Sequence, residues 1–144
     1  MLDYPIKTRP KVTYTIITDV TEEVISIAEA KSYMGIDFPD FDVIIPMFIK
    51  AARQEAEKHT GLSIGVRQIK LAGDFTDPEA YMPFAPFGGY TTDGIQNVGY
   101  TAATLPGDLK LALLTMIHTA FENRTTGLNF NLKLLDKSRR RVGL

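Results

Sequence analysis

The strongest pattern in the chain is a stripe of apolar residues at helical spacing between residues 105 and 127. Its members recur at steps of three and four residues: Leu109, Ala112, Leu113, Met116, Ile117, Ala120 and Phe121. Leu105-Pro106 with Asp108 favours a helix start there, and Thr126-Gly127 favours the end. The spacing predicts one long helix whose stripe faces the core.

The same segment carries a second, weaker apolar stripe, formed by Leu111, Leu114 and His118. A helix that is apolar on two sides is usually buried on two sides. Each leucine hidden from water contributes roughly 1.5–3 kcal/mol, so leaving this stripe exposed is costly. We therefore expect the second stripe to contact another subunit.

Another amphipathic segment, Val43 to His59, predicts a second long helix. Its apolar positions, again three or four residues apart, are Ile45, Phe48, Ala52, Ala56 and His59. Asp42 is the expected N-cap, and Pro46 then kinks the first turn or delays the start. Gly61 supplies the positive φ that commonly ends a helix.

A shorter helix is predicted from Ile27 to Tyr33. Ser26 and Glu29 have the spacing of a capping box, and Gly35 ends the segment. Asp37 to Asp42 then forms a turn.

Strand patterns are short. Val12 to Thr18 and Ile64 to Phe75 are rich in β-branched residues with partial alternation, which predicts two strands. The interval Thr76 to Thr104 has too many prolines and glycines for a long element, so we expect a loop or hairpin. Its rings should pack on the chain's own core or on another chain; the contact candidates are Tyr81, Phe84, Phe87 and Tyr90.

Length and composition indicate one domain. With 144 residues, 44% of them hydrophobic, the chain fits a single core. We predict a mainly α fold: two long packed helices, a short N-terminal helix and a small strand or hairpin insertion. Residues 1–11, with Pro5 and Pro10, form an N-terminal arm, and residues 129–144 form a C-terminal tail.

Charge and cysteine content exclude several classes of function. The 16 basic and 17 acidic residues nearly cancel, so electrostatic recognition must be local. Zero cysteines exclude disulfides and thiolate metal sites. No apolar run is long enough to cross a bilayer and no signal peptide is evident, so we expect a soluble protein made in a cytoplasm, without membrane contact.

Catalytic patterns are missing from the sequence. Glu55 and His59 have helical i, i+4 spacing, but a zinc site of that type needs a second histidine on the helix. The carboxylates of Asp37, Asp40 and Asp42 have no such partners either. No phosphate-binding loop or serine elbow is present. We expect no enzyme and no cofactor.

Three segments resemble the head-tail connector family of long-tailed phages and gene-transfer particles. They are Ile25–Ile36 (ISIAEAKSYMGI), Phe48–Gly61 (FIKAARQEAEKHTG) and Leu105–Arg124, which contains LKLALL and FENR. Their order and rough spacing agree with that family, and they cover nearly half of the chain. Between the second and third segments the family has a fuller strand layer than Ile69 to Thr104 indicates.

The resemblance implies a structural virion protein at the head-tail junction. It implies a ring of about twelve copies beneath the portal, joined to a tail-joining or stopper protein, with packaged DNA passing through without sequence-specific binding. The C-terminal segment would insert into the portal, which gives the docking candidates Leu132, Leu134, Leu135, Arg139, Arg140 and Arg141. Charges expected at the subunit interface are Arg53, Glu57 and Arg124.

A different class of function stays open. The run Arg139 to Arg141 could instead contact phosphates, as in a small DNA- or RNA-binding regulator. Binding that survives about 0.2 M salt and depends on these arginines would indicate the regulator.

Overall fold

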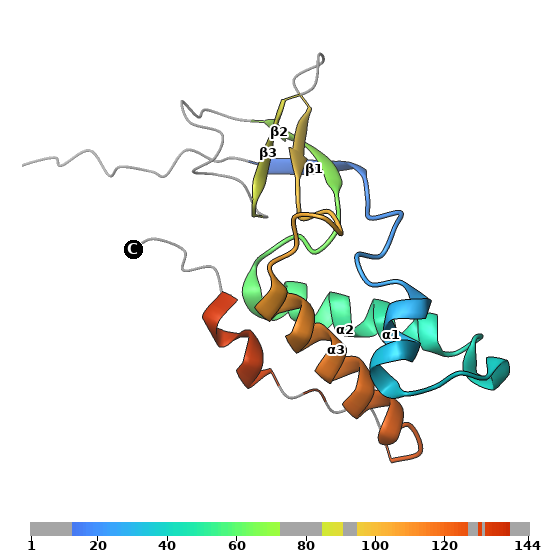
Figure 1. Cartoon of the computed structure of the whole chain (residues 1–144). Helices are drawn as coiled ribbons and strands as arrows, with labels where there is room; N and C mark the ends of the chain where they lie inside the picture. Colours follow the sequence, from blue (N-terminus) through green and yellow to red (C-terminus); the bar gives the residue numbers. More distant parts are fainter. Residues whose placement is uncertain (1–12, 73–84, 91–94, 127–129, 131, 139–144) are drawn as a thin grey trace, which may run out of the picture.

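The computed structural model describes residues 13–72, 85–90, 95–126, 130 and 132–138. Figure 1 shows the helices packed together as one layer, with a small sheet beyond the N-terminal end of the last long helix. The elements in chain order are β1 (Thr13–Thr18), α1 (Ile27–Met34), η1 (Pro39–Phe41), α2 (Ile45–Thr60), β2 (Arg67–Ala72), β3 (Phe87–Tyr90), β4 (Gln96–Val98), α3 (Gly107–Glu122) and η3 (Lys133–Ser138). The fold is mainly α with a small β element, as predicted.

The sheet is antiparallel and has four strands in the order β1-β2-β4-β3. β1 pairs with β2 with Ile16 opposite Ile69, and the register shifts before Thr18. β2 pairs with β4 with Arg67 opposite Val98. The β element is therefore larger than the predicted strand or hairpin, because distant segments pair directly. Of the predicted strand Ile64–Phe75, only Arg67–Ala72 is β2.

Helix α1 begins and ends as its sequence predicts. The Ser26 hydroxyl accepts from the Glu29 N–H at 3.1 Å, and the Glu29 carboxylate accepts from the Ser26 N–H at 3.4 Å. Gly35 follows the helix with a φ of 73°, a conformation that side chains with a Cβ rarely adopt.

Helix α2 starts later than Asp42 predicts. Ile44 is its N-cap and makes no side-chain cap bond, and Pro46 lies in the first turn, where no N–H is needed. The Asp42 carboxylate instead pairs with Lys31 of α1 at 2.8 Å. Gly61 ends the helix with a φ of 74°, as expected.

The core lies between α1, α2 and α3. The whole predicted stripe of α3 is buried. It packs against buried α2 residues such as Ile45, Ile49 and Ala52. Phe41 and Phe48 place their rings edge-on against Phe121, with ring centroids 4.9 and 6.0 Å away. Edge-to-face pairs of this kind add about 0.5–1.5 kcal/mol beyond area burial.

The C-terminal residues join this core. Leu135 in η3 has no exposed surface, and Leu132 packs against the same cluster. The predicted tail is thus partly built into the domain. The predicted arm, residues 1–11, and residues 139–144 lie outside the described part of the chain.

Candidate functional site

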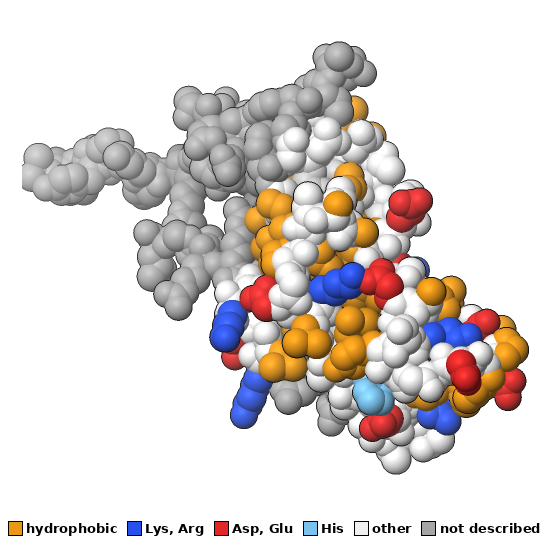
Figure 2. All heavy atoms as spheres, viewed as in Figure 1, with side chains coloured by type: hydrophobic (Ala, Val, Ile, Leu, Met, Phe, Trp, Pro, Cys, Tyr) orange, Lys and Arg blue, Asp and Glu red, His pale blue; other side chains and the backbone are white. Residues whose placement is uncertain are grey.

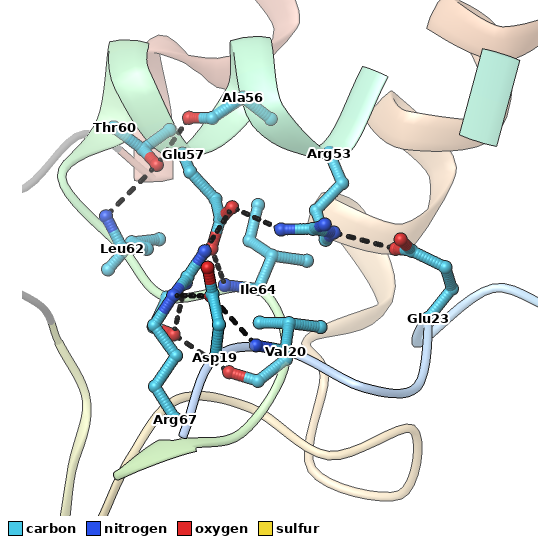
Figure 3. A network of polar contacts seen from close by, with 12 residues as sticks. Asp19, Val20, Glu23, Arg53, Ala56, Glu57, Thr60, Leu62, Ile64 and Arg67 are labelled. Atoms are coloured by element: carbon cyan, nitrogen blue, oxygen red, sulfur yellow. Dashed lines mark hydrogen bonds and ion pairs between the residues drawn. The ribbon is translucent and has the colours of Figure 1, made fainter. Parts of the chain in front are cut away.

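A cluster of buried charges lies where α2 meets the start of β2 (Figure 3). The Glu57 carboxylate is its centre: Oε1 accepts from Arg53 Nη1 at 2.6 Å and from Arg67 Nη2 at 2.9 Å. Oε2 accepts from Arg67 Nη1 and from the Ile64 N–H, the latter at 2.9 Å. These three charged side chains are at most 9% exposed. One carboxylate therefore holds two guanidinium groups.

Two further carboxylates complete the cluster from the segment between β1 and α1. Glu23 accepts from Arg53 Nε at 2.7 Å, and Asp19 accepts from Arg67 Nε at 2.8 Å. A hydrogen bond from the Val20 N–H, together with Arg67, holds the pKa of Asp19 below its ordinary value. Burial lowers the pKa of Arg67, but Glu57 and Asp19 outweigh it and raise that pKa.

The bonding of Ser63 indicates that this cluster is structural. Its hydroxyl donates to the Gly65 carbonyl at 2.7 Å and accepts from Arg67 Nη1 at 2.7 Å. A nucleophilic serine needs a base that takes its proton, and a carbonyl oxygen is not one. The cluster instead ties α2, β2 and the segment before α1 into one body.

The two histidines each face one carboxylate. His59 Nε2 lies 2.8 Å from Asp136 of η3, and His118 Nε2 lies 2.9 Å from Glu122, one turn along α3. Among the described residues, no group of three or more metal-ligating side chains comes together. The His59 pair therefore holds η3 against α2, whereas the His118 pair lies within α3.

A groove lies between α1, α3 and η3. Its apolar lining comes from Tyr33, Leu111 and Leu134, which are 40%, 55% and 51% exposed. Lys133 and Lys137 stand on its η3 side, and its volume is about 450 Å³. Figure 2 shows hydrophobic side chains gathered over α3, with basic side chains toward η3. We call this surface the α3 groove.

A second exposed apolar surface lies on the turn that leads into α2. Phe38, Val43 and Met47 are 43%, 82% and 67% exposed. Asp37 and Asp40, also exposed, stand beside them. We call residues 37–47 the acidic turn. Hydrophobic side chains this exposed commonly mark a contact surface when they form a contiguous patch.

The second stripe of α3 is divided between two environments. Leu111 lines the α3 groove, whereas Leu114 packs partly against the chain's own core. The His118 side chain is 37% exposed and contacts the Tyr33 ring edge-on, with centroids 5.9 Å apart. Of the three predicted interface residues, Leu111 presents the most open apolar surface.

The charges predicted for the subunit interface lie elsewhere. Arg53 and Glu57, predicted at the subunit interface, are instead paired with each other within the chain, in the buried cluster of Figure 3. The Arg124 guanidinium stacks over the rings of Phe121 and Phe41, 4.4 and 4.9 Å from their centroids. Its Nη1 also donates to the Phe121 carbonyl, so Arg124 stabilises the end of α3.

The remaining predicted contact residues fall into three groups: those outside the described residues, those in β3 and those in the C-terminal segment. Tyr81 and Phe84 lie outside the described residues, as do Arg139, Arg140 and Arg141. Phe87 and Tyr90 are the end residues of β3. Leu132 and Leu135 pack into the domain core, so in this structure only Leu134 of the three predicted docking leucines is exposed.

Comparison with protein-family models, with characterised proteins and with solved structures gives no match. Within the described ranges, none of the helices has the length and apolar character needed to cross a bilayer.

Sequence reasoning missed the cluster, and it predicted a turn at Asp37–Asp42 without its exposed apolar side chains. Arg67 occupies an inward position of β2, on the same face as the buried residues Ile69 and Leu71. An inward arginine requires a carboxylate partner, which was the available signal. For the acidic turn, the structure shows this surface in Val43 and Met47, which are 82% and 67% exposed.

Proposed function

We propose that this protein is an adaptor subunit of a phage head-tail junction, forming a ring of about twelve copies beneath the portal. The main support for the proposal is that the segments with the sequence resemblance are also the segments that pack together in the fold. The three segments that resemble the connector family include α1, most of α2 and all of α3, which pack around a common core. A resemblance spread over three contacting helices supports one domain type better than a single matching helix does.

The exposed surfaces support self-association. Large aliphatic side chains are exposed to water at two places: Leu111 and Leu134 in the α3 groove, and Val43 and Met47 in the acidic turn. Hiding one such side chain contributes roughly 1.5–3 kcal/mol. A ring subunit has two neighbours and therefore needs two contact surfaces, and the α3 groove and the acidic turn are two candidates.

The proposed role is mechanical. A ring of this domain would continue the DNA channel below the portal and offer its far side to a tail-joining or stopper protein. DNA would pass through without sequence-specific contacts. The Arg139–Arg141 segment would dock on the portal. The proposal includes no reaction and no cofactor, and it places the protein in the virion after synthesis in the host cytoplasm.

Electron microscopy of negatively stained protein tests the proposal. The purified chain is imaged alone and after mixing with the portal encoded in the same genome. We expect rings, free or capping the portal, and co-sedimentation with portal particles. A ring-forming protein unrelated to the portal would give free rings without portal binding.

The opposite result has a clear meaning. Compact monomers in both samples, with no portal association at any protein concentration tested, would overturn the adaptor proposal. Nucleic-acid binding in 0.05 and about 0.2 M salt would then be compared, with the three arginines replaced by serine as control. Arginine-dependent binding that persists at the higher salt would favour the regulator.

A further inference from the structure

The acidic turn is a fixed projection rather than a loose loop. Phe38 and Phe41 contact each other with ring centroids 5.7 Å apart, and Phe41 is anchored against Phe121. The ion pair between Lys31 and Asp42 ties the base of the turn to α1. Asp37 and Asp40 make no ion pair with a described residue. The turn therefore presents apolar side chains together with uncompensated negative charge.

The α3 groove combines an apolar lining with basic side chains. Its floor is apolar through Leu111 and Leu134, and Lys133 and Lys137 supply positive charge along η3. Among the described residues that line it, Asp108 is the one acidic residue, and its Oδ1 accepts from the Leu109 N–H at 2.9 Å.

We infer that the acidic turn of one copy docks in the α3 groove of the next copy of the same chain. Apolar contact between Met47 or Val43 and Leu111 or Leu134 provides the burial. Asp37 and Asp40 then lie opposite Lys133 and Lys137, and such complementary charge fixes orientation and register. This inference deepens the proposed ring and rests on it, because it names the subunit contact.

The positions of the two surfaces require a contact between molecules. In Figure 1 the turn projects at the right end of the helical layer, and η3, one wall of the groove, lies at its left end. A copy therefore does not fill its own groove. A contact between two different surfaces is heterologous, and repeating it gives a closed ring when the rotation closes. A self-complementary dimer would instead pair like with like.

Cysteine cross-linking tests the contact directly, because the natural chain has no cysteine. We would prepare Met47→Cys and Leu134→Cys as separate proteins and treat them with a short bis-maleimide, alone and mixed. Both positions are more than half exposed, so folding should be unaffected. Covalent dimer should form in the mixture and not in either protein alone. Gln54→Cys, exposed on α2, replaces Met47→Cys in the control mixture.

Charge reversal provides a second test that needs no cross-linker. One variant carries Asp37→Lys with Asp40→Lys, and the other carries Lys133→Glu with Lys137→Glu. Each alone should assemble at least about tenfold more weakly, because like charges then face each other. Mixing the two should restore assembly, since every contact in an alternating ring pairs opposite charges again. Circular dichroism and thermal unfolding verify that each variant folds.

The outcomes separate this inference from the proposed function. Cross-linking specific to the mixture, together with rescue on mixing, supports the contact. If wild-type rings form but neither effect is seen, the contact is wrong and the adaptor proposal stands. Cross-linking of Met47→Cys alone would show like surfaces meeting, which also overturns it. If no association occurs even on the portal, and no cross-link forms, both fail.

Discussion

Replacing Glu57 with glutamine should strongly destabilise the fold. The carboxylate lies between Arg53 and Arg67, and the three side chains are at most 9% exposed. Glutamine keeps the shape but removes the charge, so two buried guanidinium groups face a neutral amide. Removing one partner from a buried ion pair typically costs about 3–5 kcal/mol. A domain is usually stable by about 5–15 kcal/mol, so this loss is a large share.

Urea denaturation followed by far-ultraviolet circular dichroism measures the effect. For a slope of about 2 kcal/mol/M, the midpoint should fall by roughly 2 M with the slope unchanged. Glu55→Gln is the matched control, because this residue lies on the same helix outside the cluster. Its effect should stay within about 0.5 kcal/mol.

A double-mutant cycle with Arg67→Met shows whether the two residues act as a unit. Removing Arg67 should cost less in the Glu57→Gln background, where its charge is already poorly compensated. We expect a coupling energy of about 0.5–3 kcal/mol. If Glu57→Gln matched the Glu55→Gln control, or if the cycle showed strict additivity, the cluster would not join helix and sheet as described.

Three other measurements test separate parts of the structure. Because the Val20 N–H and Arg67 lower the pKa of Asp19, ionised Asp19 stabilises the fold above its ordinary value of 3.8, and that contribution is lost as the pH falls through the lowered pKa. Acid titration of unfolding should therefore show a shallower decline for Asp19→Asn than for wild type. Gly99→Ala should cost at least about 2 kcal/mol in thermal unfolding, since φ is 110° and a Cβ would overlap the Gly65 carbonyl; an unchanged melting temperature would contradict this geometry. Leu135→Ala should cost about 2–5 kcal/mol and Leu134→Ala much less, because only Leu135 is buried, and equal effects would mean that η3 is not docked.

Helices were predictable because their signals are local. The α3 stripe and the Ser26–Glu29 box each lie within a few turns of chain, and the structure places them as expected. The start of α2 was mispredicted because Asp42 has a competing partner, Lys31, eleven residues away. A capping preference of about 1 kcal/mol does not decide between two uses of one carboxylate.

The sheet and the charged cluster were not predictable to the same degree. Ile16 pairs with Ile69, and Asp19 pairs with Arg67. Roughly fifty residues separate the partners in each pair, and no local sequence pattern indicates the pairing. The tail shows the same limit, since Leu132, Leu134 and Leu135 look alike in sequence but differ in burial. Which leucine faces inward depends on where η3 docks. The His59–Asp136 contact helps to set that position.

Strand β1 is exposed along its whole length. All six positions of Thr13–Thr18 are exposed, none carries charge, and within the described part of the chain the strand pairs on one side only. Soluble proteins usually protect such an edge with lysine, proline or a bulge, and β1 has only the register shift between Ile16 and Thr18. A free copy at high concentration therefore risks stacking edge to edge with others. Keeping the protein dilute until its partners are present would favour ordered growth over precipitation.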